Sequence, residues 1–127
     1  MSNDPWYNLA LEEHLLKKVK KKEIILYLWQ NNNTIVIGRN ENPWKECRCK
    51  NFEEIGGKIA RRLSGGGAVF HDLGNLNFTF VMDKNLDNLD TQLKVILNAV
   101  NELGITANFS GRNDIVVGLK NFAGDAF

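Results

Sequence analysis

Apolar residues recur at helical spacing in two long segments of the chain, and they alternate with polar residues in several shorter ones. The first helix is expected to begin after Asp4, whose carboxylate can cap a helix with Pro5 at its first position. The lysine-rich run at 17–22 is expected to end it, because cations complement the dipole at a helix C-terminus. The residues predicted on its apolar face are Trp6, Leu9, Ala10, Leu16 and Val19, with Glu12 and Glu13 outside that face.

The second helix is expected over 89–104, with Asp90 as a candidate cap and Gly104 at its end. Its predicted apolar stripe is Leu93, Ile96, Leu97, Val100 and Leu103. Two strands are expected at 24–29 and 34–38, joined by a polar turn at 31–33. Further strands are expected at 58–63, 75–82, 105–109, 114–117 and 121–124, and a short helix in the second half of 42–57.

These elements do not alternate in the regular way of a doubly wound α/β sheet. Their order predicts an α+β fold, in which a mixed β-sheet is flanked by helices. The chain has 127 residues, which is enough for one domain with its own core. We therefore expect a single domain over residues 1–127.

The charge balance narrows the range of partners. With 16 basic and 15 acidic residues the net charge is +1, which gives no support to nucleic-acid binding through bulk electrostatics. The longest apolar run, at 24–29, is too short to cross a membrane, and the first residues lack a signal-peptide layout. Cys47 and Cys49 lie two residues apart, a spacing that bridges poorly in an extended segment. We expect reduced thiols and a cytoplasmic location, with no nucleic acid or membrane as partner.

The segment "ARRLSGGGAVFHDLGN" at 60–75 contains the strongest candidate chemistry. Three consecutive glycines, Gly65 to Gly67, weaken a strand but allow a tight turn or close approach of the backbone to a ligand. Successive N–H groups in such a turn can bind an anion, and Arg61 or Arg62 adds a planar cation suited to phosphate or carboxylate. A flexible hairpin turn with surface arginines explains the glycines equally well. Ser64 and the pair His71-Asp72 add polar groups at its edges.

A second candidate is "GRND" at 111–114, where Asn113 and Asp114 offer oxygen ligands for Mg²⁺. The same two residues can instead form an Asx-turn between strands. The segment "IGRNENPWKEC" adds Arg39 and Trp44, a cation and a ring that can wall a pocket or simply end a strand. No nucleophile with a partner base is evident, so these residues suit phosphate positioning better than covalent catalysis.

Four blocks of the sequence resemble those of the lipoate–protein ligases, in the same order and at similar spacing. They are "DPWYNLALEE", "VIGRNENPWKEC", "ARRLSGGGAVFHDLGNLNFTF" and "GRNDIVV". The resemblance implies the fold of the biotin/lipoate ligase catalytic domain and a two-step reaction. ATP and Mg²⁺ would activate lipoate to lipoyl-adenylate, and the lipoyl group would pass to a lysine of an acceptor lipoyl domain. The implied acceptors are the E2 component of a 2-oxoacid dehydrogenase or the H protein of the glycine cleavage system.

The resemblance also implies roles for particular residues. Arg62, Ser64, His71 and the glycines Gly65, Gly66 and Gly67 would line the acyl-adenylate, with Asn113 and Asp114 facing its phosphate and Mg²⁺. Arg39 and Trp44 are further candidates for adenylate binding. The lipoyl tail would need an apolar slot, which we expect near Leu63, Val69 and Phe70.

The sequence departs from the family pattern in two places. After "GRNDIVV" the family typically has a lysine expected to contact the adenylate, and here Asn121 stands at that position while Lys120 comes one residue early. The chain is also shorter than the family's catalytic domain, so we expect a truncated copy, with a complementary C-terminal fragment as one conceivable partner. Two alternatives stay open: a non-catalytic binder of lipoate or lipoyl-adenylate, and an ATP-independent lipoyl or octanoyl transferase.

Overall fold

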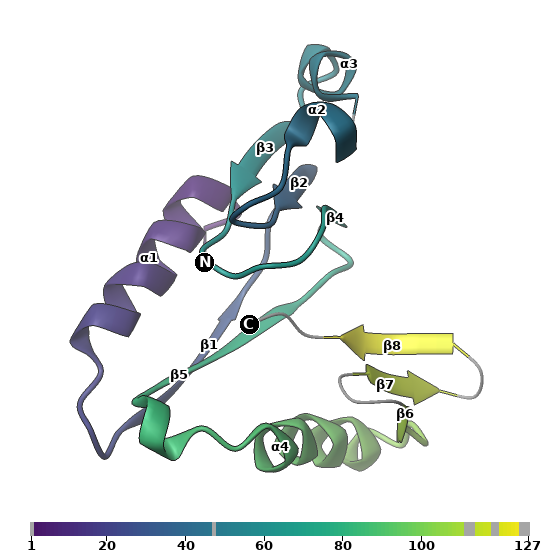
Figure 1. The fold of residues 1–127 in the computed structure, drawn as a ribbon. Helices are drawn as coiled ribbons and strands as arrows, with labels where there is room; N and C mark the ends of the chain where they lie inside the picture. Colours follow the sequence, from purple (N-terminus) through teal and green to yellow (C-terminus); the bar gives the residue numbers. More distant parts are fainter. Residues whose placement is uncertain (1, 47, 111–113, 118–119, 125–127) are drawn as a thin grey trace. The chain divides into compact units, whose positions relative to one another are not determined.

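The computed structural model describes residues 2–46, 48–110, 114–117 and 120–124, with only the backbone at Glu46, Asp114 and 120–124. The chain divides into two compact units, of which the first runs to Asn85 and the second begins at Leu86. The expected α+β class, with mixed sheet pairing and helices beside the strands, is confirmed (Figure 1). That the whole chain forms one domain stays a prediction.

The first unit contains two small sheets and three helices. Its elements are α1 (Pro5–Lys18), β1 (Ile24–Trp29), β2 (Thr34–Ile37), α2 (Pro43–Glu46), α3 (Cys49–Glu54), β3 (Lys58–Arg61), β4 (Val69–His71) and β5 (Asn77–Met82), followed by a 3₁₀ turn η1 (Lys84–Leu86). β1 pairs antiparallel with β5, and β2 lies between the parallel β3 and the antiparallel β4. The strands β1 and β2 are therefore in different sheets, although only a short polar segment joins them. That segment contains the fully buried Asn31, and Asn33 has a φ of 46°.

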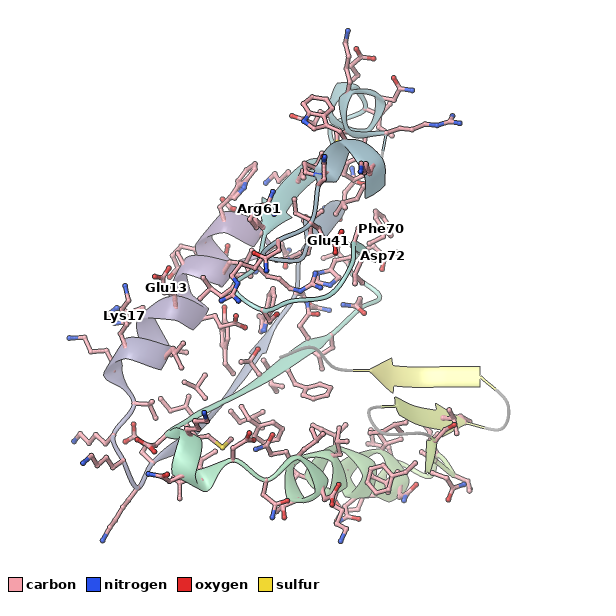
Figure 2. All side chains as sticks on the ribbon, in the orientation of Figure 1. Glu13, Lys17, Glu41, Arg61, Phe70 and Asp72 are labelled. Atoms are coloured by element: carbon pink, nitrogen blue, oxygen red, sulfur yellow. The ribbon has the colours of Figure 1, made fainter. Side chains whose placement is uncertain are left out.

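Helix α1 begins where the sequence predicts, because the Asp4 carboxylate accepts hydrogen bonds from the amides of Trp6 and Tyr7. Glu13 and Lys17 form an exposed ion pair of 3.0 Å on its surface (Figure 2). The predicted apolar face is wrong: Trp6 and Leu16 are each more than half exposed, whereas Asn8 is buried. The reason is that this helix packs through polar contacts, in which Asn8 and Glu12 bond to other elements.

The second unit contains α4 (Leu89–Glu102), β6 (Asn108–Ser110), β7 (Asp114–Val117) and β8 (Lys120–Gly124), with the three strands antiparallel in that order. Its core consists of Val100, Ala107 and Ile115, against which Ile96, Leu97 and Val117 pack. Two details of the predicted helix are wrong. Asn88, not Asp90, caps α4 by accepting from the Thr91 amide, and Leu103 is 79% exposed because the helix ends before it.

The expectation of a reduced thiol is wrong for Cys49, which is disulfide-bonded in the structure. That expectation assumed an extended backbone, but Arg48 has φ −83° and ψ 68°, the conformation of an inverse γ-turn. Cys47 lies outside the described residues. In the part of the chain that the structure describes, no helix has both the length and the apolar character needed to cross a membrane.

Candidate functional site

The glycine loop, residues 64–67, connects β3 to β4 and is held from inside by Arg62. The guanidinium donates to three backbone carbonyls: from Nε and Nη2 to Gly65 at 3.2 and 2.7 Å, from Nη2 to Gly67 at 2.9 Å, and from Nη1 to Val36 at 3.1 Å. Gly66 has a φ of +96°, and a Cβ there would lie 2.7 Å from Arg62 Nη2. The loop therefore needs glycine at its centre both for its backbone conformation and for room beside the arginine.

The amides of the glycine loop are left available by this arrangement. Within the described ranges, no backbone or side-chain group accepts a hydrogen bond from the N–H of Ser64, Gly65, Gly66 or Gly67. Because Arg62 occupies the carbonyl oxygens of Gly65 and Gly67, the loop offers donors rather than acceptors to a ligand. Consecutive free amides beside a cation form an anion-binding concavity.

The loop that follows β2, residues 38–42, packs directly against the glycine loop. The Arg39 amide donates to the Ser64 carbonyl at 2.9 Å, and the Arg62 amide donates to the Ile37 carbonyl at 3.0 Å. Gly38 is required at the contact, because a Cβ there would lie 1.9 Å from the carbonyl oxygen of Gly66. The two loops thus touch through their backbones, with no space for a side chain between them.

Arg61 holds this second loop. Its Nη1 donates to the carbonyls of Gly38, Arg39 and Glu41 at 2.9, 3.0 and 2.9 Å, and Figure 2 shows Arg61 and Glu41 beside each other. Neighbouring arginines at the end of β3 therefore serve different loops, as expected for side chains on opposite faces of a strand. Burial lowers the pKa of Arg62, which lies among backbone groups of the first unit. Both arginines bind backbone in this structure, a role that sequence analysis did not foresee.

His71 ends β4 and belongs to a buried polar chain that no pattern in the sequence indicates. His71, Asn31 and Asn8 are 7%, 0% and 2% exposed. Asn31 Nδ2 lies 3.1 Å from His71 Nδ1, and Asn8 Nδ2 donates to Asn31 Oδ1 at 3.0 Å. Burial, followed by the positive charge of Arg62, lowers the pKa of His71, so the imidazole is neutral at neutral pH. The Trp29 ring packs edge-on against the His71 imidazole, with 6.1 Å between the two ring centroids.

The other expected residues of the first unit lie at its surface. Trp44, on α2, is 80% exposed, and Arg39 is also exposed. The residues expected to wall an apolar slot, Leu63, Val69 and Phe70, are each about half exposed. The Phe70 ring packs edge-on against the ring of Phe52 on α3, with 6.2 Å between the two ring centroids. These apolar side chains flank the glycine loop in sequence on both sides.

The candidates of the second unit are described only in part. Asn113 lies outside the described residues, and Asp114 is placed through its backbone at the start of β7. In the β7–β8 pairing Lys120 stands opposite Val117 and Asn121 opposite Val116, and then Ala123 stands opposite Ile115. This irregularity leaves Phe122 as an extra residue, so positions in this strand cannot be matched by simple alternation. Of the residues with described positions, no group of three or more His, Cys, Asp or Glu could hold a metal ion.

Comparison with known families places these features in context. A model of the lipoyl protein ligase A/B catalytic domain matches residues 4–127. Lipoate-protein ligase A of Blochmanniella pennsylvanica (strain BPEN) is 52% identical over 120 residues, which cover 94% of this chain and 35% of that protein. The protein of the same name from Blochmanniella floridana is 48% identical over 130 residues, which cover 99% of this chain and 39% of that protein. The chain thus spans little more than a third of the length of these relatives.

Solved structures give the same result. P. falciparum LipL1 in complex with lipoate is 42% identical, with a TM-score of 0.87 over 97% of this chain and 40% of that one. The bipartite lipoate protein ligase of Thermoplasma acidophilum comes from a structural analysis that includes its E2 lipoyl domain. It is 26% identical, with a TM-score of 0.87, and the match covers 98% of this chain and 52% of that one. A lipoate-protein ligase A bound with ATP is 26% identical, with a TM-score of 0.82, and the match covers 93% of this chain and 54% of that one.

Proposed function

Because the chain belongs to the lipoyl protein ligase A/B catalytic domain family, we propose that it binds lipoyl-adenylate and serves lipoate–protein ligation. Relatives named lipoate-protein ligase A, at about half identity, support this proposal, as do similar structures that contain lipoate or ATP. The reaction begins with attack of a lipoate carboxylate oxygen on the α-phosphorus of ATP. A new P–O bond forms, the bond to the β-phosphate oxygen breaks, and pyrophosphate leaves.

The glycine loop is the part of the chain that binds the phosphate of the adenylate. One observation carries this assignment: Arg62 turns the carbonyls of Gly65 and Gly67 inward, while the amides of the same loop have no partner among the described residues. Negative charge builds on the phosphate oxygens during the first step, and donors that are already in place stabilise it without reorganisation. Arg62 thus acts mainly by holding the loop, and its positive charge adds to the attraction for phosphate.

The second step transfers the lipoyl group to a lysine amine of an acceptor lipoyl domain, with AMP as the leaving group. The similar bipartite ligase of Thermoplasma acidophilum, from a structural analysis of that ligase and its E2 lipoyl domain, supports this class of acceptor. Asn113 and Asp114 would hold Mg²⁺, which would neutralise charge on the phosphates. Asn113 and the side chain of Asp114 lie outside the described part of the chain. Leu63, Val69 and Phe70 offer the apolar surface for the lipoyl tail, since each has about half of its surface free.

Calorimetry with three ligands tests the binding proposal. A non-hydrolysable lipoyl-adenylate analogue should bind more tightly than lipoate or ATP alone, because it engages the glycine loop and the apolar surface together. Equal, weak binding of all three ligands would rule the proposal out. Octanoyl-adenylate analogue in the same experiment measures whether the apolar surface distinguishes the two acyl chains.

A second candidate function, a binder of lipoyl-adenylate without catalytic activity, is favoured by Asn121 at the expected lysine position. Loss of one preorganised donor typically costs about 10²–10³ in rate, whereas the glycine-loop contacts are separate and can survive it. If this second function is the correct one, the chain releases little or no lipoate-dependent pyrophosphate with ATP and Mg²⁺, and Asn121→Lys gives a measurable gain.

Lys120 provides the control for this experiment. If the chain is active with Asn121 in place and Lys120→Ala abolishes that activity, the neighbouring lysine has taken the role. The irregular pairing beside Asn121 makes this outcome physically reasonable, since an extra residue changes which positions of a strand correspond. An ATP-independent transferase would instead transfer acyl groups to the acceptor domain, and no pyrophosphate would be released.

A further inference from the structure

The buried chain Asn8–Asn31–His71 has two members, Asn8 and Asn31, to which no role has been assigned so far. Asn8 comes from α1, Asn31 from the segment between β1 and β2, and His71 from β4. Nearly complete burial of three polar side chains is costly unless each is hydrogen-bonded in a defined way. The contacts of Asn8 show how this is achieved.

Asn8 determines the orientation of Asn31. Its Nδ2 faces three oxygens: the Gln30 carbonyl at 2.7 Å, Asn31 Oδ1 at 3.0 Å and the Ser2 carbonyl at 3.1 Å. An amide oxygen could not occupy that position, because it would face three acceptors. The amide of Asn8 is therefore fixed, and it fixes Oδ1 of Asn31 toward itself. Asn31 Nδ2 then points at His71 Nδ1, 3.1 Å away.

An amide nitrogen can only donate, so the Nδ1 atom of His71 must accept this bond. In a neutral imidazole the proton then resides on Nε2. The hydrogen bond of His71 to another described side chain is made through Nδ1, and none is made through Nε2 among the described residues. In the described part of the chain the one buried side-chain nitrogen or oxygen without a partner is Asn77 Nδ2, so Nε2 of His71 reaches solvent. The imidazole thus presents a single N–H outward from a fixed ring.

We propose that Asn31 is a positioning residue that holds His71 as its Nε2–H tautomer, making Nε2 a hydrogen-bond donor to the ligand of the glycine loop. The ligand part of this inference rests on the proposed function. Arg62 connects the two sites through the backbone. It clamps the glycine loop and also donates to the Val36 carbonyl, and Val36 pairs with Val69, two residues before His71 on β4. An oxygen of the acyl-adenylate, on its phosphate or its carbonyl, is the acceptor that this donor suits.

The tautomer can be measured directly. The chain has two histidines, so His14→Gln on the exposed face of α1 leaves His71 as the only imidazole. Long-range proton–nitrogen NMR spectra of the ¹⁵N-labelled ring at neutral pH should show a protonated Nε2 and an unprotonated Nδ1. A protonated Nδ1 in this otherwise unchanged chain would overturn the proposal, whether or not any Asn31 variant folds.

Asn31→Asp changes the chemistry at His71 with little change of shape. A carboxylate still accepts from Asn8 Nδ2, but it offers His71 an acceptor where the amide offered a donor. Nδ1 should then become protonated, and the pKa of His71 should rise because a carboxylate favours the imidazolium. Asn32→Asp is the matched control, since it adds the same charge one residue away on an exposed side chain. If both variants give the same imidazole spectra, Asn31 has no specific role.

Binding separates the role of His71 from the proposed function. At a pH where the spectra show a neutral imidazole, Asn31→Asp should weaken binding of the non-hydrolysable lipoyl-adenylate analogue by about tenfold, the scale of one hydrogen bond. His71→Leu, which has no side-chain donor, should weaken it similarly, and Asn32→Asp should not. If the unmodified chain binds no analogue, the proposed function fails, while the tautomer spectra still report on Asn31. If Asn31→Asp binds as tightly as the parent at a pH where its imidazole is neutral and protonated on Nδ1, the donor role of Nε2 is excluded.

Discussion

The two loops that meet at Gly38 and Gly66 are held in the same way but use their amides differently. Each has its carbonyls clamped by one arginine from the end of β3, Arg61 for the loop after β2 and Arg62 for the glycine loop. In the loop after β2, the Arg39 amide donates to Ser64 and the Glu41 amide donates to Gly38. In the glycine loop, the amides find no acceptor among the residues with described positions.

This difference separates a supporting loop from a binding loop. The loop after β2 uses the amides of Arg39 and Glu41 within the protein, and the Arg39 bond joins it to its neighbour. In the proposed function, the amides of the glycine loop bind the ligand. The arginines, which in the sequence look like phosphate ligands, mainly determine which backbone groups face outward. Charge-assisted hydrogen bonds to carbonyls are strong enough to hold such a loop, at roughly 1.5–3 kcal/mol each.

Gly38→Ala should have the largest effect, because it disturbs both loops together. The new Cβ would lie 1.9 Å from the Gly66 carbonyl oxygen, so the backbones must separate. We expect binding of the lipoyl-adenylate analogue to fall by more than roughly a hundredfold, measured by calorimetry, since overpacking of this kind costs about 1–3 kcal/mol and also displaces the amides.

Gly56→Ala is the matched control for that variant. Gly56 has a φ of +88° at the end of α3, and a Cβ there would have no atom within 4 Å. Alanine therefore adds backbone strain without a clash, and thermal unfolding should show a lower midpoint while analogue binding is retained. Equal loss of binding in both variants would show that the two loops do not meet as closely as described.

Arg62→Ala should be the next largest change. It frees the carbonyls of Gly65 and Gly67 and removes a nearby positive charge, so we expect analogue binding to weaken by about 10- to 100-fold. Arg62→Lys keeps the charge but cannot reproduce the planar set of donors, and it should recover only a small part of the loss. Full recovery with lysine would mean that charge, and not loop geometry, is the main contribution.

Arg61→Ala should weaken binding by only about threefold, because its carbonyl contacts are all in the supporting loop. The side chain is exposed, so water can replace it at those carbonyls. Calorimetry of Arg61→Ala and Arg62→Ala with the same analogue provides the comparison. A larger loss from Arg61→Ala than from Arg62→Ala would reverse the assignment of supporting and binding loops.

Ser64→Ala should have the smallest effect, about twofold in analogue affinity. The structure uses the Ser64 carbonyl to accept from the Arg39 amide, and this contact survives the change. Only a hydroxyl contact to the ligand would be lost, and a neutral hydrogen bond contributes little net free energy. A loss above tenfold would indicate that the hydroxyl has a larger role than the loop amides.

The sequence predicted the parts of this site that depend on local rules. Three consecutive glycines signalled a backbone that must approach something closely, and Asp4-Pro5 signalled the start of α1. The direction of the arginine side chains relative to their neighbours followed from strand alternation. What the arginines bind did not follow, because the carbonyls of Val36, Gly38, Arg39 and Glu41 come from a part of the chain at least 20 residues away.

The buried chain Asn8–Asn31–His71 shows a second limit. Asn8 interrupts no apolar pattern that could have marked it as buried, and the predicted face of α1 put Trp6 and Leu16 inside instead. Polar burial is determined by partners on other elements, here the segment after β1 and the strand β4. The same holds for the β7–β8 pairing, where an extra residue cannot be located by counting alternation in the sequence.

The central claim is that amides of the glycine loop, freed by Arg62, bind the phosphate of lipoyl-adenylate. Backbone amide NMR tests it most directly, by titrating the ¹⁵N-labelled chain with an adenylate analogue that keeps the phosphate charge. The N–H signals of Gly65, Gly66 and Gly67 should move to higher proton frequency on binding and exchange more slowly with water, and those of Arg39 and Glu41 should change much less. Binding of the analogue with the three glycine signals unmoved would contradict the claim.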